Sequence, residues 1–174
     1  MLAYVFWHWP TPSSGEKEAY EDAQRRFHAS LATLKPEGFM RSWSYELDRA
    51  PWLSATPQYE DWYLLEGSGA LDTLNAAAVS LPMRVDHDRA AAGAGGVGGL
   101  YALHSGVPAE RSGPAAWFAK PKGESYQHLY ERLPADAVVW RRQMVLGPAP
   151  EFLLEGGASL PEDILATLVG RRLL

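Results

Sequence analysis

The chain has 174 residues, no cysteine and a formal net charge of −5 at pH 7. Its length and its hydrophobic fraction of 47% fit a folded globule, either one domain or two small halves that share a core. The acidic balance argues against nucleic acid as a partner, and the lack of cysteine excludes disulfides, thiolate metal sites and cysteine nucleophiles.

The first half of the chain predicts the order strand, helix, strand, strand, helix, strand. The first strand is rich in aromatic residues and stops at Pro10, and the capping-box spacing of Ser13 and Glu16 opens the first helix. Apolar residues then recur at helical spacing as far as Leu34. The predicted strands cover residues 3–9, 39–47, 59–66 and 100–105, and the predicted helices cover residues 13–34 and 71–81.

The second half predicts the same order with shorter connections. Residues 64–67 and 153–156 both read Leu-Leu-Glu-Gly, each time at the end of an apolar, strand-like run. Ser159 and Glu162 are spaced as another capping box, which predicts a last helix through Leu168 and leaves only a stub of an eighth strand. The other predicted elements are strands over residues 116–120, 138–146 and 151–155 and a helix that starts at Tyr126.

The ordered recurrence of these landmarks predicts an internal duplication, with a first repeat over residues 1–106 and a shorter second repeat over residues 107–174 of one compact domain. Each repeat has the ferredoxin-like βαββαβ order, whose antiparallel sheet carries helices on one face only. We therefore predict an α+β fold in which the two antiparallel sheets pack face to face.

In its element order and duplication, the chain resembles the dimeric α+β barrel superfamily, in the fused two-repeat form of the chlorite-dismutase-like proteins. The resemblance implies the fold. It leaves the activity open, because members include heme-degrading and cofactor-free monooxygenases, polyketide cyclases, isomerases, decarboxylases and heme peroxidases.

The glycine-rich run at residues 93–98 matches a dinucleotide-binding string but follows a predicted helix and leads into a strand. It is interpreted as a flexible connector and a candidate lid over a cavity. Asp86, His87 and Asp88 precede this run, but contiguous side chains do not converge on one ion without special turns. No metal site is therefore predicted.

Large aromatic residues alternate with arginine on the second strand, where Arg41, Trp43 and Tyr45 share one face. Such a face suits a partly filled barrel interior, in which a guanidinium group stacks on an indole or meets a carboxylate ligand. Together with Trp62 of the third strand, these are the predicted ligand-binding residues. The alternative interpretation is a structural arginine between two sheets, or a protein–protein surface.

Only two histidines, His8 and His104, lie on predicted strands. A strand histidine among aromatic residues is a candidate general base or heme ligand. The first and fourth strands are antiparallel neighbours, so the two histidines lie at opposite ends of the sheet and cannot act as a pair. Each histidine would have to act alone, and a lone buried histidine is commonly structural. His8 is the predicted catalytic residue, with a structural role as the alternative. No cofactor is predicted, because no histidine lies on a second-half strand, where heme-binding relatives place theirs.

Two hypotheses of function follow. The first is a cofactor-free enzyme or binding protein for a small hydrophobic or aromatic metabolite in a cavity between the sheets. The alternative is a non-catalytic oligomeric interaction or scaffold module with a filled barrel. No apolar run is long enough to cross a membrane, so a soluble, cytoplasmic protein without a membrane partner is expected. A homo-oligomer is expected because the eighth-strand stub would leave an uncovered sheet edge.

Overall fold

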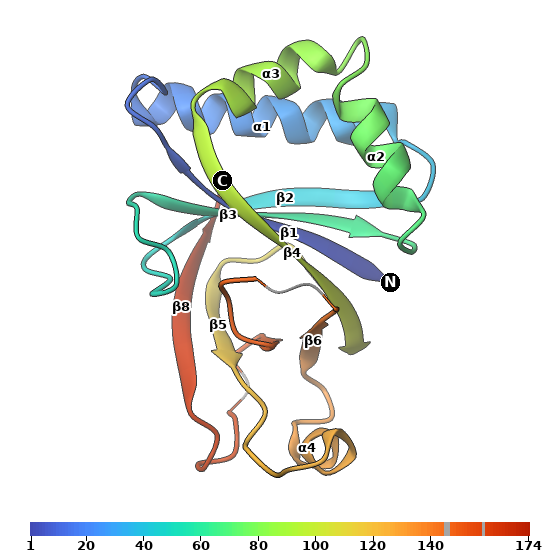
Figure 1. Cartoon of the computed structure of the whole chain (residues 1–174), viewed down its shortest axis with the longest axis vertical. Coiled ribbons are helices and arrows are strands. Elements are labelled where there is room, and N and C mark those ends of the chain that lie inside the picture. The colour runs from blue at the N-terminus through green and yellow to red at the C-terminus, as the bar shows by residue number, and fades with distance from the viewer. Residues whose placement is uncertain (145–146, 158) are drawn as a thin grey trace.

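The computed structural model describes residues 1–144, 147–157 and 159–174. Within these residues, eight antiparallel strands close into a barrel in the order β1-β3-β2-β8-β5-β7-β6-β4 (Figure 1). The strands are β1 (Leu2–Pro10), β2 (Phe39–Leu47), β3 (Gln58–Leu65), β4 (Ala94–Ser105), β5 (Gly113–Phe118), β6 (Val138–Arg142), β7 (Phe152–Glu155) and β8 (Ala166–Leu173). The helices are α1 (Lys17–Leu34), α2 (Ala70–Ala78), α3 (Arg84–Ala92) and α4 (Tyr126–Arg132).

Each half of the chain contributes a run of neighbouring strands to this α+β barrel. The first half supplies the run β4-β1-β3-β2, and the second half supplies the run β8-β5-β7-β6. The two runs join where β2 pairs with β8 and where β4 pairs with β6. Within the described residues, every strand therefore has a neighbour on both sides, which removes the exposed edges of an open sheet.

The helices lie outside the barrel. Figure 1 shows α1, α2 and α3 over the outer face of the first run of strands, with α4 at the opposite end of the molecule. α1 covers the sheet because its buried residues recur at helical spacing, as in Tyr20, Gln24, Phe27 and Leu31. No helix in the described part of the chain is both long and apolar enough to cross a bilayer.

Tryptophan side chains fill the interior of the barrel. One buried hydrophobic cluster takes residues from every strand of the barrel, and its largest members are Trp7, Trp43, Trp62, Trp117 and Trp140. The ring centroids of Trp7 and Trp117 lie 5.6 Å apart, and those of Trp62 and Trp140 lie 5.1 Å apart. Because each of these pairs joins the two halves of the chain, the halves share one aromatic core.

The predicted last helix is wrong. Residues 159–165 contain no helix, and β8 follows them as a full strand that pairs with both β5 and β2. Val169 and Arg171 are buried while Leu168 is exposed, which is the two-residue period of a strand. The uncovered edge that motivated the homo-oligomer is thus missing from the described residues, and the homo-oligomer stays a prediction.

Residues 94–98 of the glycine-rich run lie in a strand, so its interpretation as a connector and lid is wrong. It pairs with β1 as part of β4, with Gly96 opposite His8 and Gly98 opposite Phe6. A Cβ at Gly96 would lie 2.2 Å from the ring of Phe6, so glycine lets this ring lie across β4. The segment before the run, which contains Asp86, His87 and Asp88, forms α3.

The ends of two elements also differ from the prediction. α1 begins after Glu16 without a side-chain cap, so the predicted capping box is wrong, and the hydroxyl of Ser13 lies 2.9 Å from that of Thr11 instead. β6 ends at Arg142. Residues 145–146, which end the predicted strand, lie outside the described residues.

Candidate functional site

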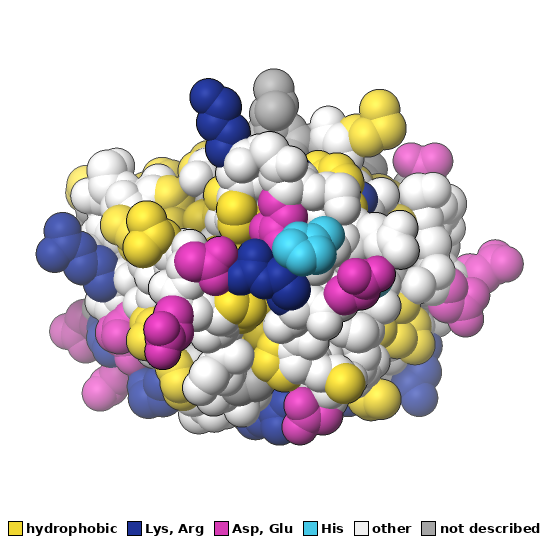
Figure 2. All heavy atoms as spheres, turned by 90° about the horizontal axis from the view of Figure 1, so that it is seen from below, with side chains coloured by type: hydrophobic (Ala, Val, Ile, Leu, Met, Phe, Trp, Pro, Cys, Tyr) yellow, Lys and Arg dark blue, Asp and Glu magenta, His cyan; other side chains and the backbone are white. Residues whose placement is uncertain are grey.

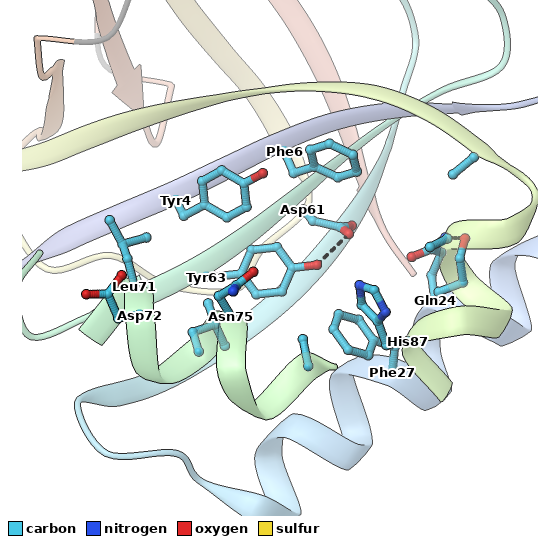
Figure 3. Close-up of a pocket in the computed structure, with 15 residues that line it drawn as sticks. Tyr4, Phe6, Gln24, Phe27, Asp61, Tyr63, Leu71, Asp72, Asn75 and His87 are labelled. Atoms are coloured by element: carbon cyan, nitrogen blue, oxygen red, sulfur yellow. Dashed lines mark hydrogen bonds between the residues drawn. The ribbon is translucent and has the colours of Figure 1, made fainter. Parts of the chain in front are cut away.

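A cavity of about 480 Å³ lies between the outer face of the sheet and the helices α1, α2 and α3 (Figure 3). Its walls are largely aromatic and include Tyr4 and Phe6 from β1, Tyr63 from β3 and Phe27 from α1. In Figure 3 the carboxylate of Asp61 lies between the rings of Phe6 and Tyr63, and Phe27 lies beside His87. The volume falls within the range of about 300–1,000 Å³ that is usual for small-molecule sites.

Strand alternation decides which side chains of β1 reach this cavity. Val5 and Trp7 belong to the core inside the barrel, whereas Tyr4 and Phe6 pack with the residues under the helices. His8 follows the same period and contacts α1. The helix-covered face of β1 is therefore aromatic and carries one histidine.

β3 presents its two acidic residues to opposite faces. Glu60 accepts hydrogen bonds from the indole of Trp62 inside the barrel, whereas Asp61 and Tyr63 face the helices. The pairing of β1 with β3 places Phe6 directly opposite Asp61. An aromatic ring thus lies next to a carboxylate on the cavity floor.

Asp61 is the centre of a buried polar cluster. Its side chain is 2% exposed and accepts hydrogen bonds from the Tyr63 hydroxyl at 2.9 Å and from His8 Nε2 at 3.0 Å. His28 Nε2 lies 3.4 Å from the same carboxylate oxygen as His8. The hydroxyl of Tyr20 lies 2.5 Å from the other ring nitrogen of His8.

The hydrogen-bond roles follow from the carboxylate. A carboxylate only accepts hydrogen bonds, so Nε2 of His8 carries a proton and donates it toward Asp61. The other ring nitrogen, Nδ1, forms the hydrogen bond with the hydroxyl of Tyr20. Because both ring nitrogens are engaged and His8 is 1% exposed, this histidine orients Asp61 and does not itself face a ligand.

The surroundings of Asp61 keep it ionised. Burial alone would raise its pKa, but the charges of His8 and His28 and their hydrogen bonds outweigh burial and hold the pKa well below the ordinary value of 3.8. Burial and the neighbouring Asp61 raise the pKa of Tyr63, so its hydroxyl keeps its proton and remains a donor. Asp61 therefore stays ionised at neutral pH and is a weak base.

The remaining polar residues of the cavity come from the helices. Gln24 of α1, His87 of α3, and Asp72 and Asn75 of α2 all line it. Asp72 and Asn75 are exposed and lie at the rim. Among the described residues that line the cavity, none is lysine or arginine. The site thus combines aromatic walls with acidic side chains.

The residues predicted from the sequence do not meet in one site. Trp43, Tyr45 and Trp62 belong to the buried core inside the barrel. Arg41 lies with its guanidinium carbon 5.2 Å from the ring centroid of Trp43 and donates to a backbone carbonyl. His8 is on the other face of the sheet, against α1. The sheet therefore separates His8 from the predicted ligand-binding residues.

Four residues of the polar cluster, Tyr20, His28, Asp61 and Tyr63, were not predicted at a site. One signal in the sequence could have found them. Glu60 and Asp61 are adjacent in a strand that is mostly apolar and aromatic, and carboxylates are rarely fully buried unless they are paired. Each therefore needed a partner on its own face of the sheet.

No protein-family model, curated protein or solved structure matches the chain. Within the described residues, no group of three or more histidine, aspartate or glutamate side chains is placed to hold a metal ion. The chemistry of the site is therefore argued from its geometry.

Proposed function

We propose that the protein binds a small hydrophobic or aromatic molecule in the cavity between the sheet and α1, α2 and α3. The observation that carries this proposal is a cavity of about 480 Å³ with aromatic walls and one buried carboxylate, Asp61, held in place by hydrogen bonds. Ligand sites in proteins typically have this composition, with mostly apolar walls and few, well-placed polar groups. The tryptophan-filled barrel interior leaves the helix-covered face as the better location.

The geometry supports binding better than proton transfer. A general base works best when its pKa lies near the working pH, whereas the pKa of Asp61 lies well below 3.8. His8, the candidate base in the sequence, uses both ring nitrogens within the protein. Asp61 is therefore proposed as an anchor for the ligand, with His8 as a positioning residue.

Filling the cavity tests this proposal. Ala78 of α2 lines the cavity, whereas Ala76 on the same helix is exposed and is not part of the wall. Ala78→Trp should abolish the binding of one-ring and two-ring aromatic fragments, detected by ligand-observed NMR, and Ala76→Trp should leave it unchanged. Fragments that bind both variants equally, or that do not bind the native protein, would contradict the proposal. Native mass spectrometry of freshly purified protein reports any co-purified molecule.

A second candidate function, an oligomeric interaction module, is favoured by the filled barrel and by exposed apolar side chains on the second half. Leu165 and Leu168 are 91% and 70% exposed. If this half self-associates, sedimentation should give a mass above the 19.2 kDa of one chain. Replacing both leucines with lysine should then reduce the mass to that of a single chain. A native protein that sediments as a monomer at high concentration contradicts this candidate.

The end of the molecule that carries α4 offers less support for such an interface. Figure 2 views this end and shows apolar side chains scattered among acidic and basic ones. Around α4, ion pairs join Arg132 to Glu124 and Asp163. Mixed charges of this kind are typical of a solvated surface.

We also propose that the barrel is a duplicated ferredoxin-like unit of the dimeric α+β barrel type. The two halves support this with equivalent strand orders, β4-β1-β3-β2 and β8-β5-β7-β6. In chain order, the first strand of each half is followed by a helix, with α1 after β1 and α4 after β5. The second half differs in having no helix in residues 159–165, before β8. An experimental structure whose two runs of strands do not superimpose would contradict the duplication.

A further inference from the structure

We infer that the ligand of this cavity is an organic cation, an aromatic or aliphatic body that carries a protonated or quaternary amine. The inference rests on the proposed binding function and adds the charge of the ligand. It follows from three properties of the residues around the cavity, namely their charges, the free hydrogen-bonding capacity of Asp61 and the placement of the aromatic rings.

The charges that face the cavity are predominantly negative. Asp61 lies on the floor and Asp72 lies at the rim, in the first turn of α2. Among the described lining residues, His87 is the one side chain able to carry a positive charge, and it contacts Asp88 on the same helix. An anionic ligand would meet these carboxylates without an arginine or lysine to bind it, which disfavours acids and phosphates.

Asp61 has capacity for a further hydrogen bond. A carboxylate offers about four lone-pair positions. One oxygen, Oδ1, faces His8 and His28, whereas the other, Oδ2, accepts one hydrogen bond among the described residues, from Tyr63. Oδ2 can therefore accept an N–H donor from the cavity, and hydrogen bonds between charged partners are stronger than those between neutral ones.

The aromatic rings provide a second attraction for a cation. The centroids of Tyr4 and Tyr63 lie 5.8 Å apart, those of Tyr4 and Phe6 lie 6.2 Å apart, and those of Phe27 and Tyr63 lie 6.3 Å apart. The faces of such rings carry partial negative charge and attract ammonium groups. Phe6 is the cross-strand neighbour of Asp61, so a cation near the carboxylate is also close to an aromatic ring.

A neutral molecule is the main competitor, because the aromatic walls would also accept an uncharged ring. It would bind without ion pairing to Asp61 and without the attraction of Asp72. A cation should therefore bind with higher affinity than a neutral molecule of the same size, and this difference in affinity can be measured. Anions should bind most weakly of the three.

Two matched probe series measure this preference. The one-ring series is phenethylamine, 2-phenylethanol and 3-phenylpropionate, and the two-ring series is tryptamine, tryptophol and indole-3-propionate. In at least one series, calorimetry or NMR titration at low salt should show the amine binding about tenfold more tightly than the alcohol, with the acid weakest. Added salt should reduce this preference.

Variants that remove one negative charge show which carboxylate causes the preference for amines. Asp72→Asn, at an exposed position, should weaken amine binding about threefold and leave alcohol binding unchanged. Glu18→Gln removes the same charge from an exposed position of α1 outside the cavity wall and should change neither. Asp61→Asn should remove most of the preference, provided that circular dichroism shows the native fold.

The outcomes separate the two proposals. If alcohols or acids bind as tightly as amines and Ala78→Trp abolishes that binding, the cation inference is wrong and the binding function stands. If no member of either series binds the native protein, both are overturned. Equal losses of amine affinity in Asp72→Asn and Glu18→Gln would show general surface attraction and would also overturn the inference.

Discussion

Arg171 and Glu60 form an ion pair inside the barrel, with 2.6 Å between Arg171 Nη2 and Glu60 Oε1. Arg171 lies on β8 and also meets Glu155 of β7 at 3.1 Å, whereas Glu60 lies on β3. The indole groups of Trp7 and Trp62 donate hydrogen bonds to Glu60. This cluster joins the two halves of the chain within their shared aromatic core.

Removing Arg171 should destabilise the protein strongly. Arg171→Met leaves the buried carboxylate of Glu60 without its cationic partner, and loss of one partner from a buried pair costs about 3–5 kcal/mol. The matched control is Arg172→Met, because Arg172 pairs with Glu46 outside the barrel, is 55% exposed and should contribute about 0–1 kcal/mol. Urea unfolding measures both free energies. Equal midpoints for the two variants would show that the interior pair contributes no more than the exterior one.

β3 shows which features could be predicted from the sequence and which could not. The strand itself follows from its aromatic residues and the paired leucines at its end. All residues from Gln58 to Leu65 are buried, however. The sequence of this strand therefore does not alternate between apolar and polar residues, and it does not show which face points into the barrel. Glu60 and Asp61 look equivalent in sequence, yet one pairs with Arg171 inside the barrel and the other lies on the cavity floor.

The same limit applies to the other predicted site residues. Trp43 and His8 lie on strands that were predicted correctly, but opposite faces of the sheet separate them. At residues 159–168 the capping-box spacing indicates a helix, whereas pairing with β2 and β5 over a long sequence separation makes β8 a strand. Such non-local pairing overrides local propensity and cannot be read from a short window.

Acid should destabilise the protein partly through Asp61. Its pKa in the folded state lies well below 3.8, because the histidine charges outweigh burial, so the unfolded chain binds the proton first as the pH falls. The stabilisation by this carboxylate is therefore complete above its ordinary pKa and is lost as the pH falls through the folded pKa. The free energy of unfolding should decline more steeply below about pH 4 in the native protein than in Asp61→Asn.

The control for this pH dependence is Asp22→Asn, because Asp22 is exposed on α1. This variant should keep the pH profile of the native protein. Burial raises the pKa of Glu155, so the protonation of this residue as the pH falls favours the folded state. Glu155 is present in the native protein and in both variants, so its effect is the same in all three. Parallel urea-midpoint profiles for the native protein and Asp61→Asn would contradict the assigned role of the carboxylate.

A methyl group at Gly96 should disturb both the strand pairing and the cavity. The Cβ of Gly96→Ala would lie 2.2 Å from Cζ of Phe6 and 2.8 Å from the carbonyl oxygen of Trp7, so the ring and the backbone must shift. Overpacking of this kind costs about 1–3 kcal/mol, and displacing Phe6 should weaken ligand binding. Gly67→Ala is the control, since a Cβ there meets no atom of the described residues within 4 Å. Thermal unfolding that does not distinguish the two variants would contradict this packing argument.

His8→Ala and Arg41→Ala distinguish the two faces of the sheet as ligand sites. His8 bonds to Asp61 under the helices, whereas Arg41 stacks on Trp43 on the interior side. His8→Ala removes a donor from a buried carboxylate, so it should cost about 3 kcal/mol and weaken fragment binding. Arg41→Ala affects a partly exposed side chain and should cost about 1 kcal/mol or less, with fragment binding unchanged.

Both measurements require variants that remain folded, which circular dichroism establishes before the NMR titration. If Arg41→Ala weakens fragment binding and His8→Ala does not, the ligand lies inside the barrel. The helix-covered cavity would then not be the binding site, because its floor depends on His8 and not on Arg41.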